Sequence, residues 1–234
     1  MTAGSARTMS PTALGEARAA VSAVLERHRL RADGARVRLA GSSCGGGPAL
    51  IQVNLRVCGA GARVQVAGRG IADTIEAGAV RLDRQLGRLI TGWQPWPWPD
   101  PQRPALSIPG PGTVARTKAV RLRVGRPCQA VAAMNAMDYD CHLFVDAETG
   151  EDALVYRAGC TGARLARQRT MRPPVSGVPL TVNSRKVPAL DVGEAAVWLA
   201  DGWLPFMFFT DRATGRGNLL YRRYDGDLTL VRPA

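Results

Sequence analysis

Few side chains in this sequence could carry catalytic chemistry. The two histidines are His28, which lies on the apolar stripe of an expected helix, and His142, which directly follows Cys141. Successive side chains of a strand point to opposite faces, so Cys141 and His142 cannot act together as nucleophile and base. No histidines and cysteines have metal-ligand spacing, and three acids have no marked partner: Asp138, Asp140 and Asp146. We expect neither an enzyme nor a bound cofactor or metal.

The positive charge of the chain is concentrated toward its front. The net charge is +12. Residues 1–95 hold 13 arginines against 6 acids, a charge of +7, and residues 96–119 and 169–185 add +2 and +3. Residues 120–168 and 186–234 each hold six basic and six acidic residues and are neutral. Such segregation favours a polyanion as the partner of the front region.

Eight arginines of the front region are candidates for contacts to RNA phosphates, because the guanidinium group suits phosphate. They are Arg36, Arg38, Arg56, Arg63, Arg69, Arg81, Arg84 and Arg88. An ordinary solvated arginine surface is the alternative. No exposed aromatic residues are interleaved with these arginines, so stacking of single-stranded bases is not indicated. Recognition of folded RNA through its shape and backbone fits better.

Periodicity predicts the elements that position these arginines. Apolar residues at intervals of three and four predict helices from Pro11 to about Leu30 and from Ala72 to Ile90. Alternation predicts a strand near residues 36–39 and a hairpin with its turn at Gly59-Ala60-Gly61. The expected fold is α+β: an antiparallel sheet with two helices on one face and arginines on the open face and helix flanks.

The second half of the chain contains an internal repeat. A shift of 65 positions places residues 144–157 on residues 209–222 with seven identities. Each copy reads as strand, helix, strand, turn, strand, strand, and a repeat of this kind fixes the architecture. We expect two small α+β modules behind the front domain. The predicted division is a front domain 1–95, a Pro/Trp-rich linker 96–119, a module 120–168, a basic linker 169–185 and a module 186–234.

The linker that follows the front domain alternates tryptophan and proline from Trp93 to Pro99. Proline removes backbone donors and fixes the backbone, so the segment is expected to be stiff and extended. Its tryptophans could form a docking motif or pack onto a neighbouring domain.

One strand of each copy is apolar on both faces, in residues 141–145 (apart from His142) and in residues 206–209. A module this small has little core of its own. Such a strand should therefore cover one face with its own helix and the other with a partner module. The expected association residues are Leu143, Phe144, Tyr156, Phe206, Phe208, Phe209, Tyr221 and Arg222.

No stretch of the sequence indicates export or membrane insertion. No run approaches the roughly 18 apolar residues that span a bilayer, and the N-terminus lacks the apolar core of a signal peptide. The five cysteines are odd in number and irregularly spaced, which argues against a disulfide framework. We therefore expect a cytoplasmic protein.

The repeated motifs resemble the C-terminal domain of long-form ribosome hibernation promoting factors, the S30AE or sigma-54 modulation family. The resemblance is carried by Asp191–Ala195, Phe206–Phe209, Ala147–Gly150 and Tyr221–Gly226. The front domain is similar to the family's N-terminal domain, most clearly from Ile51 to Ile90.

The resemblance implies that the front domain binds the small ribosomal subunit, its 16S rRNA and ribosomal proteins, and reversibly blocks translation under stress or dormancy. The family's C-terminal domain usually forms homodimers that join two ribosomes. This chain departs from the pattern in three ways: it shows no clear strand before Pro11, its first copy lacks the Arg-Arg-x-Asp-Gly ending and carries His142 where an aromatic residue is usual, and it has two C-terminal-type modules.

The duplication leads to the hypothesis that the two modules pair within one chain and imitate the family's homodimer. Such a protein would silence single ribosomes without joining them, whereas pairing between chains would give a homodimer. A nucleic-acid- or protein-binding stress regulator without a ribosome target is the alternative function.

Overall fold

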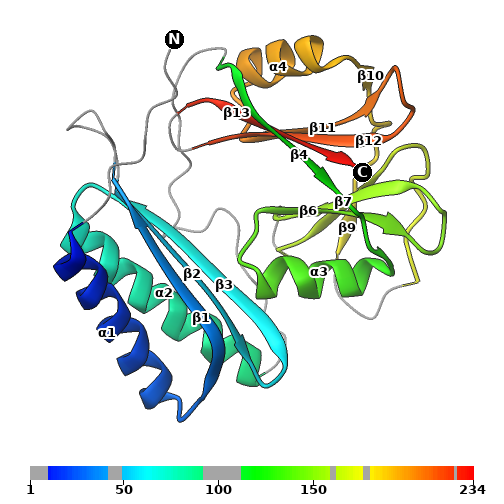
Figure 1. Ribbon diagram of the computed structural model, residues 1–234. Coiled ribbons are helices and arrows are strands. Elements are labelled where there is room, and N and C mark those ends of the chain that lie inside the picture. Colours follow the sequence, from blue (N-terminus) through cyan, green and yellow to red (C-terminus); the bar gives the residue numbers. More distant parts are fainter. Residues whose placement is uncertain (1–9, 42–48, 92–111, 159–161, 176–179, 224–225) are drawn as a thin grey trace. The chain divides into compact units, whose positions relative to one another are not determined.

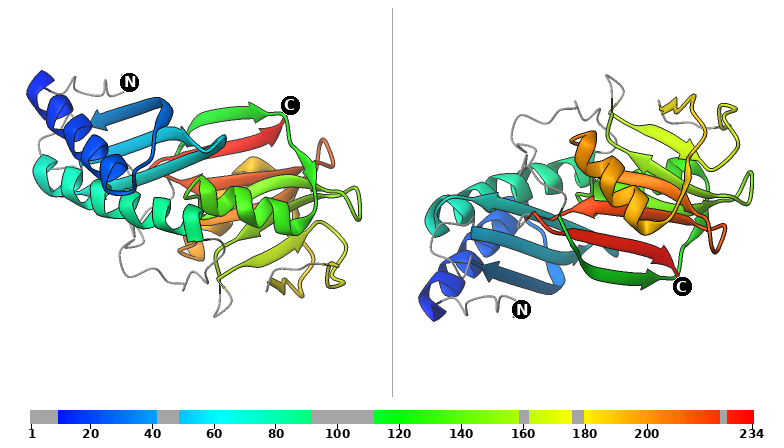
Figure 2. Two further views of the ribbon diagram at one scale, coloured as in Figure 1. Left: turned by 90° about the horizontal axis from the view of Figure 1, so that it is seen from below. Right: turned by 90° about the horizontal axis from the view of Figure 1, so that it is seen from above.

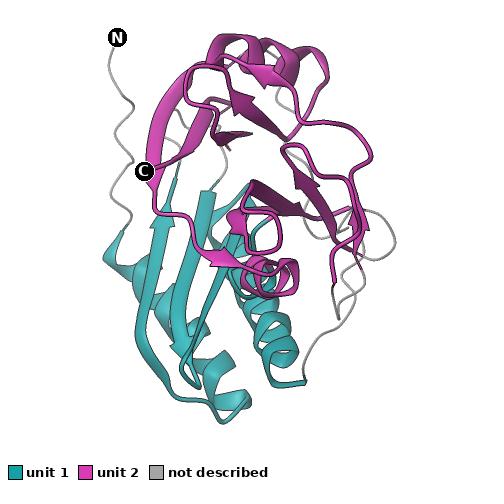
Figure 3. Ribbon diagram, turned by 90° about the vertical axis from the view of Figure 1, so that its right-hand side faces the viewer, with its two compact units in different colours: residues 1–94, 135–139 teal, residues 95–134, 140–234 magenta. Residues whose placement is uncertain are grey.

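A computed structural model describes residues 10–41, 49–91, 112–158, 162–175, 180–223 and 226–234 of the 234-residue chain. The chain forms two compact units (Figure 3). The first contains residues 1–94 together with residues 135–139, and the second contains residues 95–134 and 140–234. The expected strand before Pro11 and the tryptophan-rich linker fall outside the described residues.

The first unit is the predicted sheet with two helices on one face (Figure 1). Its elements are α1 (Pro11–Arg27), β1 (Ala32–Ala40), β2 (Ala49–Val57), β3 (Ala60–Gly68) and α2 (Ile71–Thr91). The strands are antiparallel in the order β1-β2-β3. The hydroxyl of Ser10 caps α1 by accepting from the Ala13 N–H at 3.2 Å, and Pro11 suits the first turn. The helix stops three residues before the predicted Leu30, since Arg29 has φ 53.

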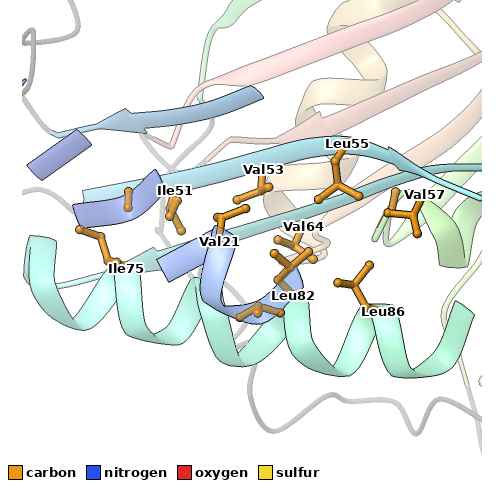
Figure 4. Packing of buried hydrophobic residues seen from close by; sticks show 12 residues of the cluster. Val21, Ile51, Val53, Leu55, Val57, Val64, Ile75, Leu82 and Leu86 are labelled. Carbon is orange, nitrogen blue, oxygen red and sulfur yellow. The ribbon is translucent and has the colours of Figure 1, made fainter. Parts of the chain in front are cut away.

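The core of the first unit lies between the helices and the sheet (Figure 4). Val21 of α1 and Leu82 of α2 pack onto a continuous row of strand residues. A Cβ at Gly78 would lie 2.6 Å from the Ile51 side chain, so glycine at this position lets α2 approach β2 closely. The alternating apolar residues face this core: Ile51, Val53, Leu55, Val57 and Val64.

The turn of the front hairpin differs from the prediction. Ala60 and Gly61 belong to β3, where they pair with Val57 and Arg56. The turn residues are Cys58 and Gly59, whose φ angles are 51° and 77°. Two successive residues with positive φ give a tight turn whose twist matches the flanking strands. The prediction was wrong because it followed the glycines, whereas a cysteine occupies the first left-handed position.

The second unit contains the two repeated modules apart from residues 135–139, which belong to the first unit. Both modules have the predicted order of strand, helix, strand, turn, strand, strand. The first consists of β5 (Val124–Gly125), α3 (Pro127–Ala136), β6 (Cys141–Asp146), β7 (Asp152–Tyr156) and β8 (Arg164–Arg167). The second consists of β10 (Ala189–Leu190), α4 (Val192–Asp201), β11 (Phe206–Asp211), β12 (Gly217–Arg222) and β13 (Leu228–Pro233). A capping box of Asp191 and Glu194 begins α4. Along the described ranges, no helix combines the length and hydrophobicity of a membrane span.

The two modules exchange strands. Strand β4 (Val114–Val120) precedes the first module but pairs in parallel with β13 of the second (Figures 1 and 2). Strand β9 (Thr181–Val182) precedes the second module but pairs in parallel with β8 of the first. The resulting sheets run β10-β11-β12-β13-β4 and β5-β6-β7-β8-β9. Both predicted linkers thus contain sheet residues: β4 crosses the expected boundary at 119/120, and β9 lies within residues 169–185.

Candidate RNA-binding face and module interface

The face of the front sheet opposite the helices carries arginines and amides in register. Arg36 lies opposite Asn54, which lies opposite Arg63, and this row crosses all three strands. A second row runs from Arg38 through Gln52 to Gln65. These positions alternate with the buried core residues, so their side chains lie on the other face. We call this surface the open face, formed by Arg36, Arg38, Gln52, Asn54, Arg56, Arg63 and Gln65.

Three arginines of the open face are exposed to solvent. Arg36 and Arg38 of β1 are exposed, as is Arg56 of β2, whose guanidinium donates to the Gly59 carbonyl at 3.0 Å. Arg63 is half-buried, because it contacts the Gln65 side chain and lies 5.1 Å from the centre of the Tyr139 ring. The exposed donors of this face therefore come chiefly from β1 and β2.

The open face has the chemistry of a surface for a nucleic-acid backbone. Four guanidinium groups stand against one acid at its end, Asp33, which pairs in register with Arg56. The strands themselves contain no aromatic residue. Guanidinium and amide groups contact phosphates and sugar hydroxyls, whereas stacking of bases needs aromatic rings.

The other four candidate arginines do not extend the open face. Arg69 is exposed just after β3, while Arg84 is exposed and Arg88 half-buried on α2, in the helix layer. Arg81 is only 6% exposed, and its guanidinium donates two hydrogen bonds of 2.8 Å to the Asp138 carboxylate. Asp138, an acid for which the sequence indicated no partner, is thus the partner of Arg81. We conclude that Arg81 supports the fold of the first unit and is not presented to a ligand.

In the second unit the two modules share an apolar core. Its buried members are Leu143, Leu154 and Ala166 from the first module and Phe208 and Leu219 from the second. The half-buried members are Leu122, Cys141, Tyr156, Val187, Phe206, Tyr221 and Val231. We call these twelve residues the shared cluster. They form six pairs related by the 65-residue shift, such as Tyr156 with Tyr221. The two modules therefore contribute equivalent residues to one core, as the two subunits of a homodimer do at a two-fold interface.

The expected association residues divide between two faces of their strands. Five belong to the shared cluster: Leu143, Tyr156, Phe206, Phe208 and Tyr221. The rings of Tyr156 and Phe206 meet edge-on with centroids 5.5 Å apart. Phe209 instead packs with Ala195 and Leu199 of α4 inside its own module, and its counterpart Phe144 is equally buried. Arg222 donates to the Gly226 carbonyl at 3.0 Å within the second module.

A polar contact at one side of the shared cluster was missed by the sequence prediction. Asp152 accepts hydrogen bonds from the Arg216 guanidinium at 2.8 and 3.1 Å and from the Gly217 N–H at 2.7 Å. The hydrogen bonds to Asp152 raise the pKa of Arg216. Gln168 also donates to Thr210 and to the Gly215 carbonyl, at 3.0 and 2.9 Å. The sequence held one indication of this contact: the 65-residue shift aligns Asp152 of the first copy with a glycine, Gly217, of the second.

Comparison with known proteins agrees with this architecture. The family model of the sigma 54 modulation/S30EA ribosomal protein C terminus matches residues 110–164. Dormancy associated translation inhibitors of two Mycobacterium tuberculosis strains, CDC 1551/Oshkosh and H37Rv, are each 52% identical over 209 residues, 86% of this chain and 76% of theirs. The chain belongs to the family of ribosome hibernation promoting factors.

In this hibernation factor the matched segment includes β4 and ends within β8. By sequence, β4 is therefore part of the first C-terminal-type module, although its hydrogen bonds go to the second. The same relation holds for β9, because the 65-residue shift carries residues 114–120 onto residues 179–185.

Three further residues considered as catalytic candidates, Cys141, His142 and Asp146, have environments that support the fold. Cys141 is part of the shared cluster, while the next side chain, His142, belongs to the opposite face of β6 by strand alternation. Burial, followed by the nearby charge of Arg123, lowers the pKa of His142. Asp146 accepts from the buried Arg167 at 2.5 Å. The candidate acid at position 146 thus has a structural ion pair.

Proposed function

We propose that this hibernation factor inhibits translation in the cytoplasm by binding the small ribosomal subunit through the open face of its first unit. The main observation behind this proposal is the pair of guanidinium–amide rows on the open face of the front sheet, in the region that holds most of the chain's net positive charge. Its relatives are named dormancy associated translation inhibitors, which supports translation as the target.

Inhibition on this proposal needs no bond-making step. Arg36, Arg38 and Arg56 neutralise rRNA phosphates, and Asn54 and Gln52 bond to sugar hydroxyls or exposed base edges beside them. The bound domain occupies space that mRNA or tRNA needs, and release restores the ribosome. Because the binding free energy comes largely from phosphate contacts, affinity should fall steeply as salt is raised.

Co-sedimentation with purified small subunits tests the proposal. The variant Arg36→Glu/Arg38→Glu should lose binding, because two phosphate contacts become repulsions. The matched control is Arg18→Glu/Arg84→Glu, which changes the net charge equally but on exposed positions of α1 and α2. The control should bind almost as well as wild type. Equal loss in both variants would reject the open face as the binding surface.

The alternative is a stress regulator that binds nucleic acid or protein elsewhere. The same arginine rows would serve a regulator, so only the target distinguishes the two functions. A wild-type protein that sediments without ribosomes under low-salt conditions, yet still binds free structured RNA, would favour the regulator.

A further inference from the structure

The apolar and polar parts of the module interface obey different symmetries. The shared cluster consists of equivalent pairs, so its apolar surface would also suit a module meeting a copy of itself. The polar contact is one-sided. The counterpart of Asp152 is Gly217, and the counterpart of Arg216 is Glu151. Only when a first module pairs with a second module does Asp152 therefore accept hydrogen bonds from an arginine and from a glycine N–H.

Steric fit makes the same distinction. Gly217 is buried, and a Cβ at this position would lie 2.7 Å from the Asp152 Cβ and 2.9 Å from the Phe208 ring. Any side chain at position 217 would therefore displace Asp152 or Phe208. The first module carries an aspartate at the equivalent position, so a second copy of it cannot take the place of the second module against Asp152.

We propose that the two modules are dedicated partners of each other, and that Asp152 and Gly217 exclude pairing of either module with its own copy. Two first modules would place Asp152 against Asp152 and Glu151, with overlapping Cβ atoms and like charges. Two second modules would avoid the overlap but set two Arg216 groups together without a carboxylate.

The connections between the modules favour pairing within one chain. The start of the segment after β8 is held on the first module, because Glu151 accepts from the Arg169 and Thr170 N–H groups at 2.7 and 3.2 Å and from the Thr170 hydroxyl at 2.6 Å. It leads to β9, and only residues 183–188 separate β9 from β10 of the second module. Six residues reach at most about 21 Å. A tether this short gives the attached module a very high effective concentration, so a second chain cannot compete for it.

The state that follows is a monomer whose association surface is already occupied. If the proposed ribosome binding is also correct, the factor acts on one ribosome at a time and does not join two. This consequence rests on the proposed function, whereas the pairing itself does not.

Light scattering coupled to size-exclusion chromatography of the full chain tests the pairing. Wild type should have the mass of a monomer at all accessible concentrations. Two differently tagged copies that are co-expressed should not co-purify. A stable wild-type dimer, or co-purification of the tagged copies, would overturn the proposal.

Variants at the polar contact test its specificity. Asp152→Arg should lower the melting temperature of the second unit and produce larger species, because two arginines then face each other. Arg216→Asp should do the same through opposed carboxylates. The double variant Asp152→Arg/Arg216→Asp restores opposite charges and should recover the monomer and much of the lost melting temperature. A double variant no better than the singles would contradict the proposed role of this contact.

The steric part has its own milder test. Gly217→Ala adds only a Cβ and should lower the melting temperature, while Gly150→Ala is a control at a glycine with open space around its Cβ position and φ 71°. Because Gly150→Ala is strained only by its own backbone, a loss at position 217 that exceeds the loss at position 150 supports close packing against Asp152. An equal loss would remove the steric argument. None of these variants touches the open face, so failure of small-subunit binding by wild type would leave their interpretation unchanged.

Discussion

The front sheet and the module sheets meet the same physical problem with opposite chemistry. Each sheet has one face covered by helical structure, and its second face must be either compatible with water or covered by another surface. In the front sheet the second face alternates arginine with amides, so it is stable in water and suited to a polyanion. In the modules the second face carries leucine, phenylalanine and tyrosine, and it is covered by the other module. One set of alternate residues thus distinguishes the proposed RNA-binding face from the interface between the modules.

The largest expected effect comes from exchanging these chemistries in the modules. Phe208→Asp would place a charge in the shared cluster, where the native ring is 8% exposed. We expect a loss of at least about 4 kcal/mol in unfolding free energy, from lost burial and an unpaired charge. Thermal or denaturant unfolding measures it.

The matched change on the front sheet is Arg38→Asp. Arg38 is exposed, so its replacement should change the free energy of unfolding by only about 0.5 kcal/mol. Similar losses in the two variants would show that the open face is not a tolerant polar surface.

A second prediction distinguishes Arg81 from Arg38, which the sequence placed together among the candidate RNA-binding arginines. Arg81→Ala should destabilise the first unit by about 3 kcal/mol, because it removes the charged group that donates two hydrogen bonds to the fully buried Asp138 carboxylate. Arg38→Gln should leave stability unchanged and reduce the slope of log affinity against log salt by about 1. Unfolding curves and salt titrations of RNA binding measure both variants. An unchanged salt slope in Arg38→Gln would remove Arg38 from the phosphate contacts.

The smallest effect concerns pH and contrasts the two modules. Burial lowers the pKa of His142 below its ordinary value of 6.5 in the folded protein, so below pH 6.5 the unfolded chain binds a proton that the folded chain resists. The stability of the second unit should therefore decline as the pH falls through and below 6.5. His142→Met, which copies the counterpart Met207, should flatten this decline in unfolding curves measured between pH 7.5 and about 5.5. A decline of the same size in the variant would assign it to other groups.

Local patterns in the sequence were sufficient to predict most of the helices and strands and their faces, although not β4 and β9. Three- and four-residue periodicity located α1 and α2, and strict alternation separated Arg36 and Arg38 from the core. The apolar strand around Phe208 correctly indicated a second covered face, because only a partner can bury both sides of a strand in so small a module.

Features that depend on pairing between distant segments were not predictable from those patterns. The exchange of β4 and β9 depends on which strand edge each segment meets, and alternation carries no information on strand order. Arg81 and Arg84 are both arginines on one helix, yet only Arg81 meets a buried acid 57 residues further along the chain. The contact between Asp152 and Gly217 likewise depends on how the two modules pack together, which local sequence patterns do not specify.

The exchanged strand β4 also makes the folding of this protein depend on a distant segment of the chain. The hydroxyl of Thr113, directly before β4, donates to the Asp227 carboxylate at 2.9 Å across 114 residues of sequence, and the partner strand of β4 is β13, residues 228–233. A growing chain therefore carries β4 without its partner until residues 228–233 have left the ribosome. Long-range pairing of this kind slows folding. The strand that precedes the first module thus has no partner until the second module has been synthesised.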